Sequence, residues 1–171
     1  MEIGATKAVQ DRLKTTKIEE SKGASLVFCW DTHLTKIKGR NVLFIVNASN
    51  RYTIAMTDIE PRNWNYYTMY IRSVIHGVMQ EMGYSEDQIG QYFKMSGNTI
   101  VTKTHGRKSV GGINRMVMDA QYFGKKPEKE AKYQWELSEY LNRDICQPEG
   151  FDECGYPSEL FKLDMERLGI I

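Results

Sequence analysis

Hydrophobic residues alternate with polar ones in the first third of the chain and recur at helical spacing in most of the rest. Residues 42–46 are apolar at every position, which is typical of a strand covered on both faces. Residues 26–30 and 52–56 carry apolar side chains at every second position, the period of a strand with one packed face. Residues that tolerate tight turns follow at 38–40 and 47–50. The stretch 25–56 therefore predicts three or four antiparallel strands.

Apolar residues at intervals of three and four predict helices elsewhere. The expected helix starts are after Thr6, near Trp64, after Ser85, after Ser109, at Pro127 and at Pro157. A short edge strand is expected over Met1 to Ala5, and a further strand over Thr99 to Thr104. The predicted fold is α+β: a single domain over residues 1–171, with an antiparallel sheet of about five strands and helices mainly on one face.

Composition places the chain among globular proteins with a substantial core. The 171 residues are 41% hydrophobic, yet no apolar run approaches the ~20 residues that span a bilayer. The first residues lack the apolar region of a signal peptide. Three cysteines are too few and odd in number for a disulfide framework, which favours a reducing compartment. We therefore expect a cytoplasmic monomer or homodimer without a membrane partner.

Charge is distributed unevenly although the net charge is only +1. Residues 32–57 and 88–118 contain no acid, whereas twelve acids face seven bases from Asp119 onward. This distribution is compatible with charges scattered over a solvated surface. It is equally compatible with one basic face that meets a negatively charged partner.

The segment 102–115 is the best candidate for an anion site. If Ser109 is the N-cap, the amides of Val110, Gly111 and Gly112 lack helical partners and the helix dipole adds positive charge there. The spacing differs from that of a phosphate-binding P-loop. Alternatively, the glycines serve close packing on the sheet and the basic loop is merely solvated. The predicted anion- or nucleic-acid-binding residues are Lys36, Lys38, Arg40, Arg51, Lys103, His105, Arg107, Lys108, Ser109, Gly111, Gly112 and Arg115.

Catalytic and metal-binding patterns are weak in this sequence. His33, His76 and His105 stand apart, so a metal site would need ligands from distant segments to converge, and we predict no metal or cofactor. No nucleophile lies in a GxSxG-like context. The acids bordering the predicted sheet, Asp31, Asp58 and Glu60, are interpreted as strand-end and turn residues. Aromatic residues around the sheet could stack on single-stranded nucleic acid, although such positions usually belong to the core.

Three segments carry a family resemblance: WDTHLTKIKGRNVLFIVNASNRYTIAM, TKTHGRKSVGGINRM and YPSELFKLDME. Together they resemble an uncharacterised family of small bacterial proteins. The matching positions are Trp30, Asn47, Arg51, Ser109 and Asn114. Residue 108 is Lys where the family pattern suggests Arg. The resemblance implies a bacterial or mobile-element origin and no established activity, and it supplies no catalytic residue.

Two functional hypotheses follow from these patterns. The first is a non-catalytic cytoplasmic binding protein whose basic face engages nucleic acid or an acidic protein partner. The second is an enzyme acting on a phosphorylated substrate, with the anion held at the helix start near Ser109 and His105 moving a proton. The second hypothesis requires His105, Arg107 and the Ser109 amide to converge on one concave site.

Overall fold

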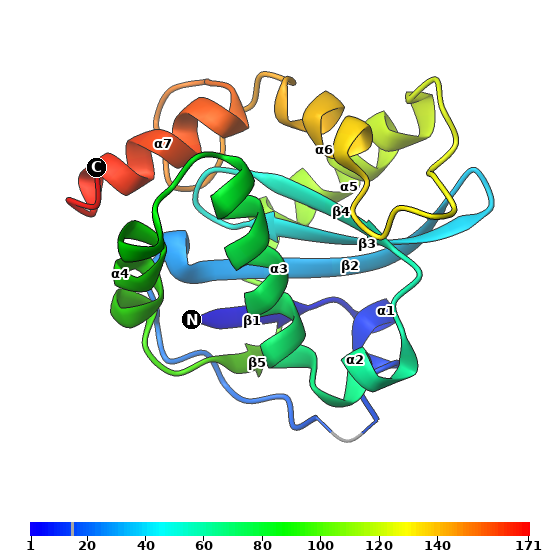
Figure 1. Cartoon of the computed structure of the whole chain (residues 1–171), viewed down its shortest axis with the longest axis horizontal. Helices are drawn as coiled ribbons and strands as arrows, with labels where there is room; N and C mark the ends of the chain where they lie inside the picture. Colours follow the sequence, from blue (N-terminus) through cyan, green and yellow to red (C-terminus); the bar gives the residue numbers. More distant parts are fainter. Residues whose placement is uncertain (15) are drawn as a thin grey trace.

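A five-stranded sheet lies at the centre of the computed structural model, which describes residues 1–14 and 16–171 (Figure 1). The strands, in their order across the sheet, are β4 (Thr53–Thr57), β3 (Arg40–Asn47), β2 (Cys29–Ile37), β1 (Glu2–Ala5) and β5 (Ile100–Thr102). β2, β3 and β4 are antiparallel neighbours, as predicted. β1, however, runs parallel to both β2 and β5. The α+β class is confirmed, but the sheet is mixed rather than purely antiparallel.

The first strand lies inside the sheet and not at its edge. All four residues of β1 are buried, including Glu2, and the strand has β2 on one side and β5 on the other. The prediction of an edge strand over residues 1–5 was therefore wrong. The edge position belongs to β5, which is shorter than the strand predicted over residues 99–104.

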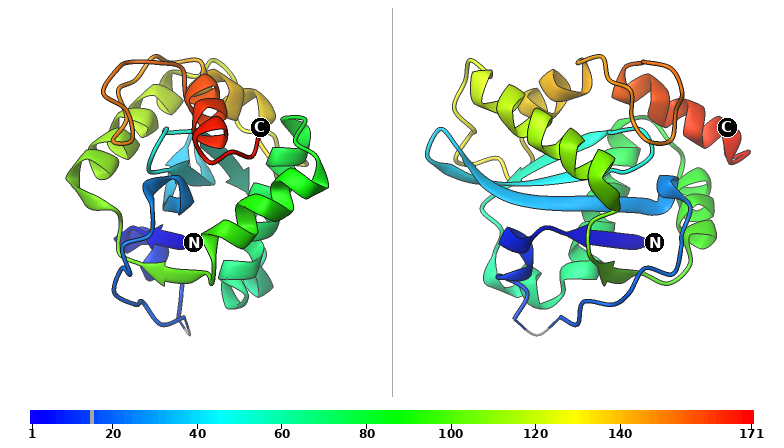
Figure 2. Two further views of the ribbon diagram at one scale, coloured as in Figure 1. Left: turned by 90° about the vertical axis from the view of Figure 1, so that its left-hand side faces the viewer. Right: turned by 180° about the vertical axis from the view of Figure 1, so that it is seen from behind.

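Helices cover both faces of the sheet. They are α1 (Lys7–Gln10), α2 (Pro61–Asn65), α3 (Tyr67–Glu81), α4 (Glu86–Ser96), α5 (Gly106–Tyr122), α6 (Trp135–Asn142) and α7 (Pro157–Arg167), and the 3-10 helix η1 (Leu26–Phe28) precedes β2. In Figure 1 α3 lies in front of the sheet, and in the rear view of Figure 2 α5 lies in front of it. Among the described residues, five helices, α1 to α4 and α7, pack on one face and two, α5 and α6, on the other, so the expectation of helices mainly on one face describes the larger group and omits the second layer.

The apolar strand β3 explains this two-sided cover. Leu43 and Ile45 pack into a core with α3, α4 and α7. Phe44 and its alternate neighbours Val42 and Val46 pack on the opposite face against α5 and α6. Because successive side chains of a strand point to opposite faces, five consecutive apolar residues need cover on both.

Two local predictions were wrong for tertiary reasons. Residues 26–28 form η1 rather than a strand, and the strand begins only at Cys29. The helix expected at Pro127 begins instead at Trp135. Residues before it extend along β4, where the Thr57 amide donates to the Lys132 carbonyl at 2.7 Å. This pairing satisfies an edge strand that would otherwise be open.

The capping box predicted at Ser85 is confirmed.

Candidate functional site

The start of α5 differs from its predicted position by about one turn. His105 is the N-cap and Gly106 the first helical residue, so Ser109 already lies in the helix. Val110, Gly111 and Gly112 are therefore interior residues, whose amides point to carbonyls four residues earlier. The predicted opening of these three amides was wrong. The helix start itself remains close to the basic residues that the sequence singled out.

A carboxylate of the protein itself occupies this helix start. Asp31, on β2, accepts hydrogen bonds from the backbone amide of His105 at 3.2 Å and from its Nδ1 at 2.7 Å. The Ser109 hydroxyl donates to the other oxygen of the same carboxylate. A negative charge near a helix N-terminus is favourable because the amides there carry partial positive charge. Asp31 thus occupies part of the place that the sequence assigned to an external anion.

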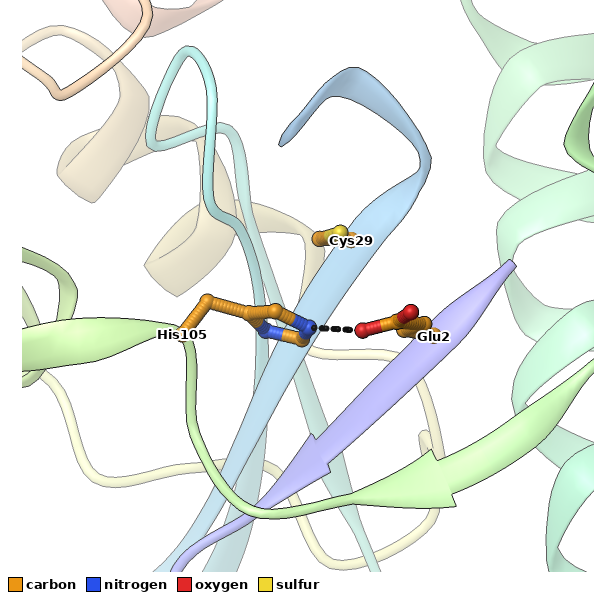
Figure 3. Close-up of side chains that lie close together, drawn as sticks. All are labelled: Glu2, Cys29 and His105. Atoms are coloured by element: carbon orange, nitrogen blue, oxygen red, sulfur yellow. Dashed lines mark hydrogen bonds and ion pairs between the residues drawn. The ribbon is translucent and has the colours of Figure 1, made fainter. Parts of the chain in front are cut away.

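His105 is held between two carboxylates, as Figure 3 shows for its contact with Glu2. Its Nε2 lies 3.1 Å from Glu2 Oε2, opposite the Nδ1 contact with Asp31. The exposed fractions of the side chains are 8% for His105, 3% for Glu2 and 0% for Asp31. The second oxygen of Glu2 accepts from the Lys22 and Ala24 amides at 2.7 and 3.3 Å. These contacts join β1, β2 and the start of α5.

Neighbouring groups, Asp31 foremost, stabilise the charged form of His105. Burial alone would lower the pKa of His105, but the hydrogen bond and charge of Asp31, with a further contribution from Cys29, raise it to about 10. Burial would likewise raise the pKa of Glu2, yet hydrogen bonds from Ser21, Lys22, Ala24 and His105 hold it below its usual value. His105 is therefore an imidazolium at neutral pH, with both ring nitrogens donating. Such a group is a poor general base.

Gly4 provides the space for this arrangement. It pairs with Asp31 across β1 and β2, and a Cβ at Gly4 would overlap the Asp31 carboxylate. Cys29 lies on the same face of the sheet, opposite Glu2 in the register. The ligand atoms of Glu2, Cys29 and His105 all lie within 4.8 Å of one another. We call Glu2, Cys29, Asp31, His105 and Ser109 the buried cluster.

A separate hollow of about 240 Å³ gathers half of the predicted binding residues. It lies between α5, the turn after β3 and residues 147–149, and we call it the basic hollow. The predicted residues that line it are Arg51, Lys108, Ser109, Gly111, Gly112 and Arg115. One acid, Glu149, also lines it. The structure thus brings basic side chains from α5 and from the distant turn after β3 to one concave surface.

Arg51 lies directly against α5 in this hollow. Its Nη2 donates to the Gly112 carbonyl at 3.3 Å, and a Cβ at Gly112 would come within 3.3 Å of its Nε. Arg51 has a φ of 62°, in the left-handed region that only a few non-glycine residues adopt. The glycine therefore lets the guanidinium approach the helix closely. Close packing was one of the two interpretations of the glycines. Gly112 does allow close packing, but against the Arg51 side chain rather than against the sheet.

The remaining predicted residues lie outside the basic hollow. Lys103 and His105 line a second hollow of about 650 Å³, together with Glu19 and Glu20. Arg107 is exposed on α5. Lys36, Lys38 and Arg40 belong to the β2–β3 hairpin near the other end of α5, where Lys38 donates to the Phe123 carbonyl. The twelve predicted residues therefore do not form one continuous surface.

Sequence reasoning missed three members of the buried cluster. Asp31 was interpreted as a strand-end residue, but it is fully buried within β2. Cys29 and Asp31 share one face because they are two residues apart on a strand, a signal already present in the sequence. The contribution of Glu2 could not be foreseen, because parallel pairing of β1 with β2 depends on the crossover through the intervening chain.

The fold and the buried cluster define an α+β protein with a mixed sheet, in which a histidine at the start of α5 lies between two carboxylates. The chain belongs to a family of unknown function: the family model described as "Domain of unknown function (DUF6933)" matches residues 2–160. The resemblance to an uncharacterised family is thereby confirmed. No curated protein and no solved structure matches the chain. Within residues 1–14 and 16–171, no helix combines the length and the apolar character needed to cross a membrane.

Proposed function

We propose that this chain is a non-catalytic, cytoplasmic binding protein of bacterial or mobile-element origin, whose basic hollow takes a phosphate group of a nucleic acid. The observation that carries this proposal is the convergence of Arg51, Lys108 and Arg115 on one concave surface. An Arg or Lys side chain forms charge-assisted hydrogen bonds to phosphate, and phosphate contacts supply most of non-specific nucleic-acid affinity. An acidic protein partner stays an alternative prediction for the same surface.

The local geometry favours an external anion in the hollow over a purely internal network. Lys108 is exposed on α5. Arg115 contacts Asp119 at 3.1 Å on the exposed helix surface, where such pairs contribute little and rearrange readily. Arg51 uses one nitrogen for the Gly112 carbonyl, and a guanidinium has five donors in all. Positive side chains with remaining donors therefore face the hollow.

The enzyme hypothesis gains less support from the same contacts. His105 lines the second hollow and Ser109 lines the basic hollow, so a phosphate at Ser109 does not lie beside the imidazole in one cavity. Both ring nitrogens of His105 already contact carboxylates. The hypothesis requires His105 and the start of α5 near Ser109 to face one cavity. Instead, the side chains of His105 and Ser109 both contact the buried Asp31 carboxylate.

The proposal is tested with fluorescently labelled single-stranded and duplex oligonucleotides, titrated with the full chain and followed by anisotropy at two salt concentrations. Binding at the lower salt concentration should weaken steeply at the higher one. Lys108→Glu should reduce the affinity several-fold more than Lys94→Glu, which reverses the charge of a matched exposed lysine on α4. Equal affinities of the two variants, or no binding at low salt, would contradict the proposal.

A further inference from the structure

Three chemically different metal-binding groups meet inside the buried cluster, although they are far apart in sequence. Glu2 comes from β1, Cys29 from β2 and His105 from the start of α5, and Figure 3 shows the Glu2 and His105 side chains directed toward each other with Cys29 beside them. Their ligand atoms lie within 4.8 Å of one another, and the closest contact given above is 3.1 Å. Ligands around a tetrahedral zinc ion are about 3.3–3.8 Å apart, as metal–ligand distances of about 2.0–2.3 Å require. Small side-chain movements would therefore suffice.

Asp31 holds His105 in the orientation that a metal site requires. Its carboxylate accepts from Nδ1 at 2.7 Å, which directs Nε2 away from Asp31 and toward Glu2 and Cys29. Histidines that bind zinc usually donate their other ring nitrogen to a carboxylate, which fixes the tautomer and increases the basicity of the ligand. One oxygen of Glu2 is fixed in the same way by the Lys22 and Ala24 amides. The other oxygen faces the centre.

We propose that Glu2, Cys29 and His105 bind a zinc ion, with Asp31 as the positioning carboxylate behind His105. The donor set is one thiolate, one imidazole and one carboxylate, which suits Zn²⁺ better than Mg²⁺ or Ca²⁺ because the latter prefer oxygen ligands alone. Three protein ligands leave a fourth position for water, as in catalytic zinc sites. This site is separate from the basic hollow and does not depend on the proposed nucleic-acid binding.

The exchange preserves the charge of the protein interior. Without metal, the Cys29 thiol donates toward the Ala24 and Ser25 carbonyls, and His105 carries a proton on each ring nitrogen. Binding of one Zn²⁺ releases the thiol proton and the Nε2 proton to solvent. Nδ1 keeps its proton and still donates a hydrogen bond to Asp31. Two single positive charges leave and one doubly charged ion enters, so no uncompensated charge is buried.

A hollow adjoins the buried cluster at His105. The second hollow, of about 650 Å³, is lined by His105 together with Glu19, Glu20 and Ser21. Carboxylates at the rim of a hollow raise the local concentration of cations. This hollow is the side from which the ion and its fourth ligand, a water molecule, would approach His105.

The test uses the full chain, stripped with a chelator and titrated with Co²⁺ alone, then with Zn²⁺ in competition. We expect saturation at one equivalent, a thiolate-to-cobalt charge-transfer band, and displacement by Zn²⁺. Cys29→Ser should abolish the band, whereas Cys154→Ser, which changes an exposed cysteine, should retain it. Asp31→Asn should retain the band and weaken zinc affinity about 10–100-fold.

X-ray absorption of the zinc-loaded wild-type protein keeps the proposal testable if Cys29→Ser does not fold. It should show one sulfur and otherwise nitrogen or oxygen neighbours. Two sulfur neighbours would indicate the Cys146 and Cys154 loop and overturn the proposal. An unchanged cobalt band in folded Cys29→Ser, or no saturable uptake by the wild type, would overturn it as well.

Discussion

Replacing His105 by Gln removes a positive charge that lies between two buried carboxylates. Glu2 and Asp31 would then lie in the interior without their common cation, and removal of one partner of a buried ion pair costs about 3–5 kcal/mol. Each carboxylate keeps other donors: Glu2 the Lys22 and Ala24 amides, Asp31 the amide of residue 105 and the Ser109 hydroxyl. We therefore expect a loss near the lower end, about 3 kcal/mol in the free energy of unfolding.

The assays are urea and thermal unfolding of the full chain at pH 7 with a chelator present, both followed by circular dichroism. A loss of about 3 kcal/mol should lower the melting temperature by about 6–12 °C in a protein of this size. His76→Gln is the matched control, because His76 contacts Glu86 at the same 3.1 Å on an exposed surface. Its cost should be about 0–1 kcal/mol. The reasoning is refuted if both histidine variants lose the same stability, or if adding Glu2→Gln to His105→Gln restores none of it.

Two further predictions concern pH and packing. The folded state raises the pKa of His105 to about 10, so the stability that protonated His105 contributes is complete below about pH 6.5, declines above it and is lost as pH passes through 10. Urea midpoints of the wild type should therefore fall over this range more than those of His105→Gln. Parallel curves for the two proteins would contradict this. Gly4→Ala should destabilise the protein by about 1–3 kcal/mol through overlap with Asp31, whereas Gly77→Ala in α3, where the described residues leave open space, should stabilise it by up to about 1 kcal/mol. Equal effects of the two alanines in urea unfolding would be evidence against the close fit at Gly4.

Local patterns were enough to predict much of the antiparallel half of the sheet and most helices. The alternation over residues 52–56 and the apolar run over residues 42–46 correspond to β4 and β3. The alternation predicted one packed face, however, whereas β4 is buried on both. The capping box at Ser85 depends only on residues within one helical turn, and it formed as expected. The helix expected at Pro127 failed because residues 131–134 pair with β4, a tertiary contact that outweighs local propensity.

The candidate sites also differ in whether local sequence patterns or tertiary contacts determine them. The sequence indicated the basic loop, the glycines near Ser109 and Arg51, and the structure brings Arg51 to the same hollow as Lys108 and these glycines. It could not indicate the buried cluster, whose members Glu2, Cys29 and His105 are brought together by parallel pairing of β1 with β2 and by the start of α5. Ligands that lie far apart in the sequence leave no characteristic spacing. A metal site made from Glu2, Cys29 and His105 therefore could not be predicted without the strand order.

The salt dependence of duplex binding tests the proposed function most directly. The logarithm of the association constant should fall linearly with the logarithm of the salt concentration, with a slope of about 0.9 per phosphate contact. Lys108→Gln should make this slope shallower by about one unit, because it removes one phosphate contact. Lys94→Gln should leave the slope of the wild type unchanged. Identical slopes for the wild type and Lys108→Gln would contradict the assignment of the basic hollow as the binding surface.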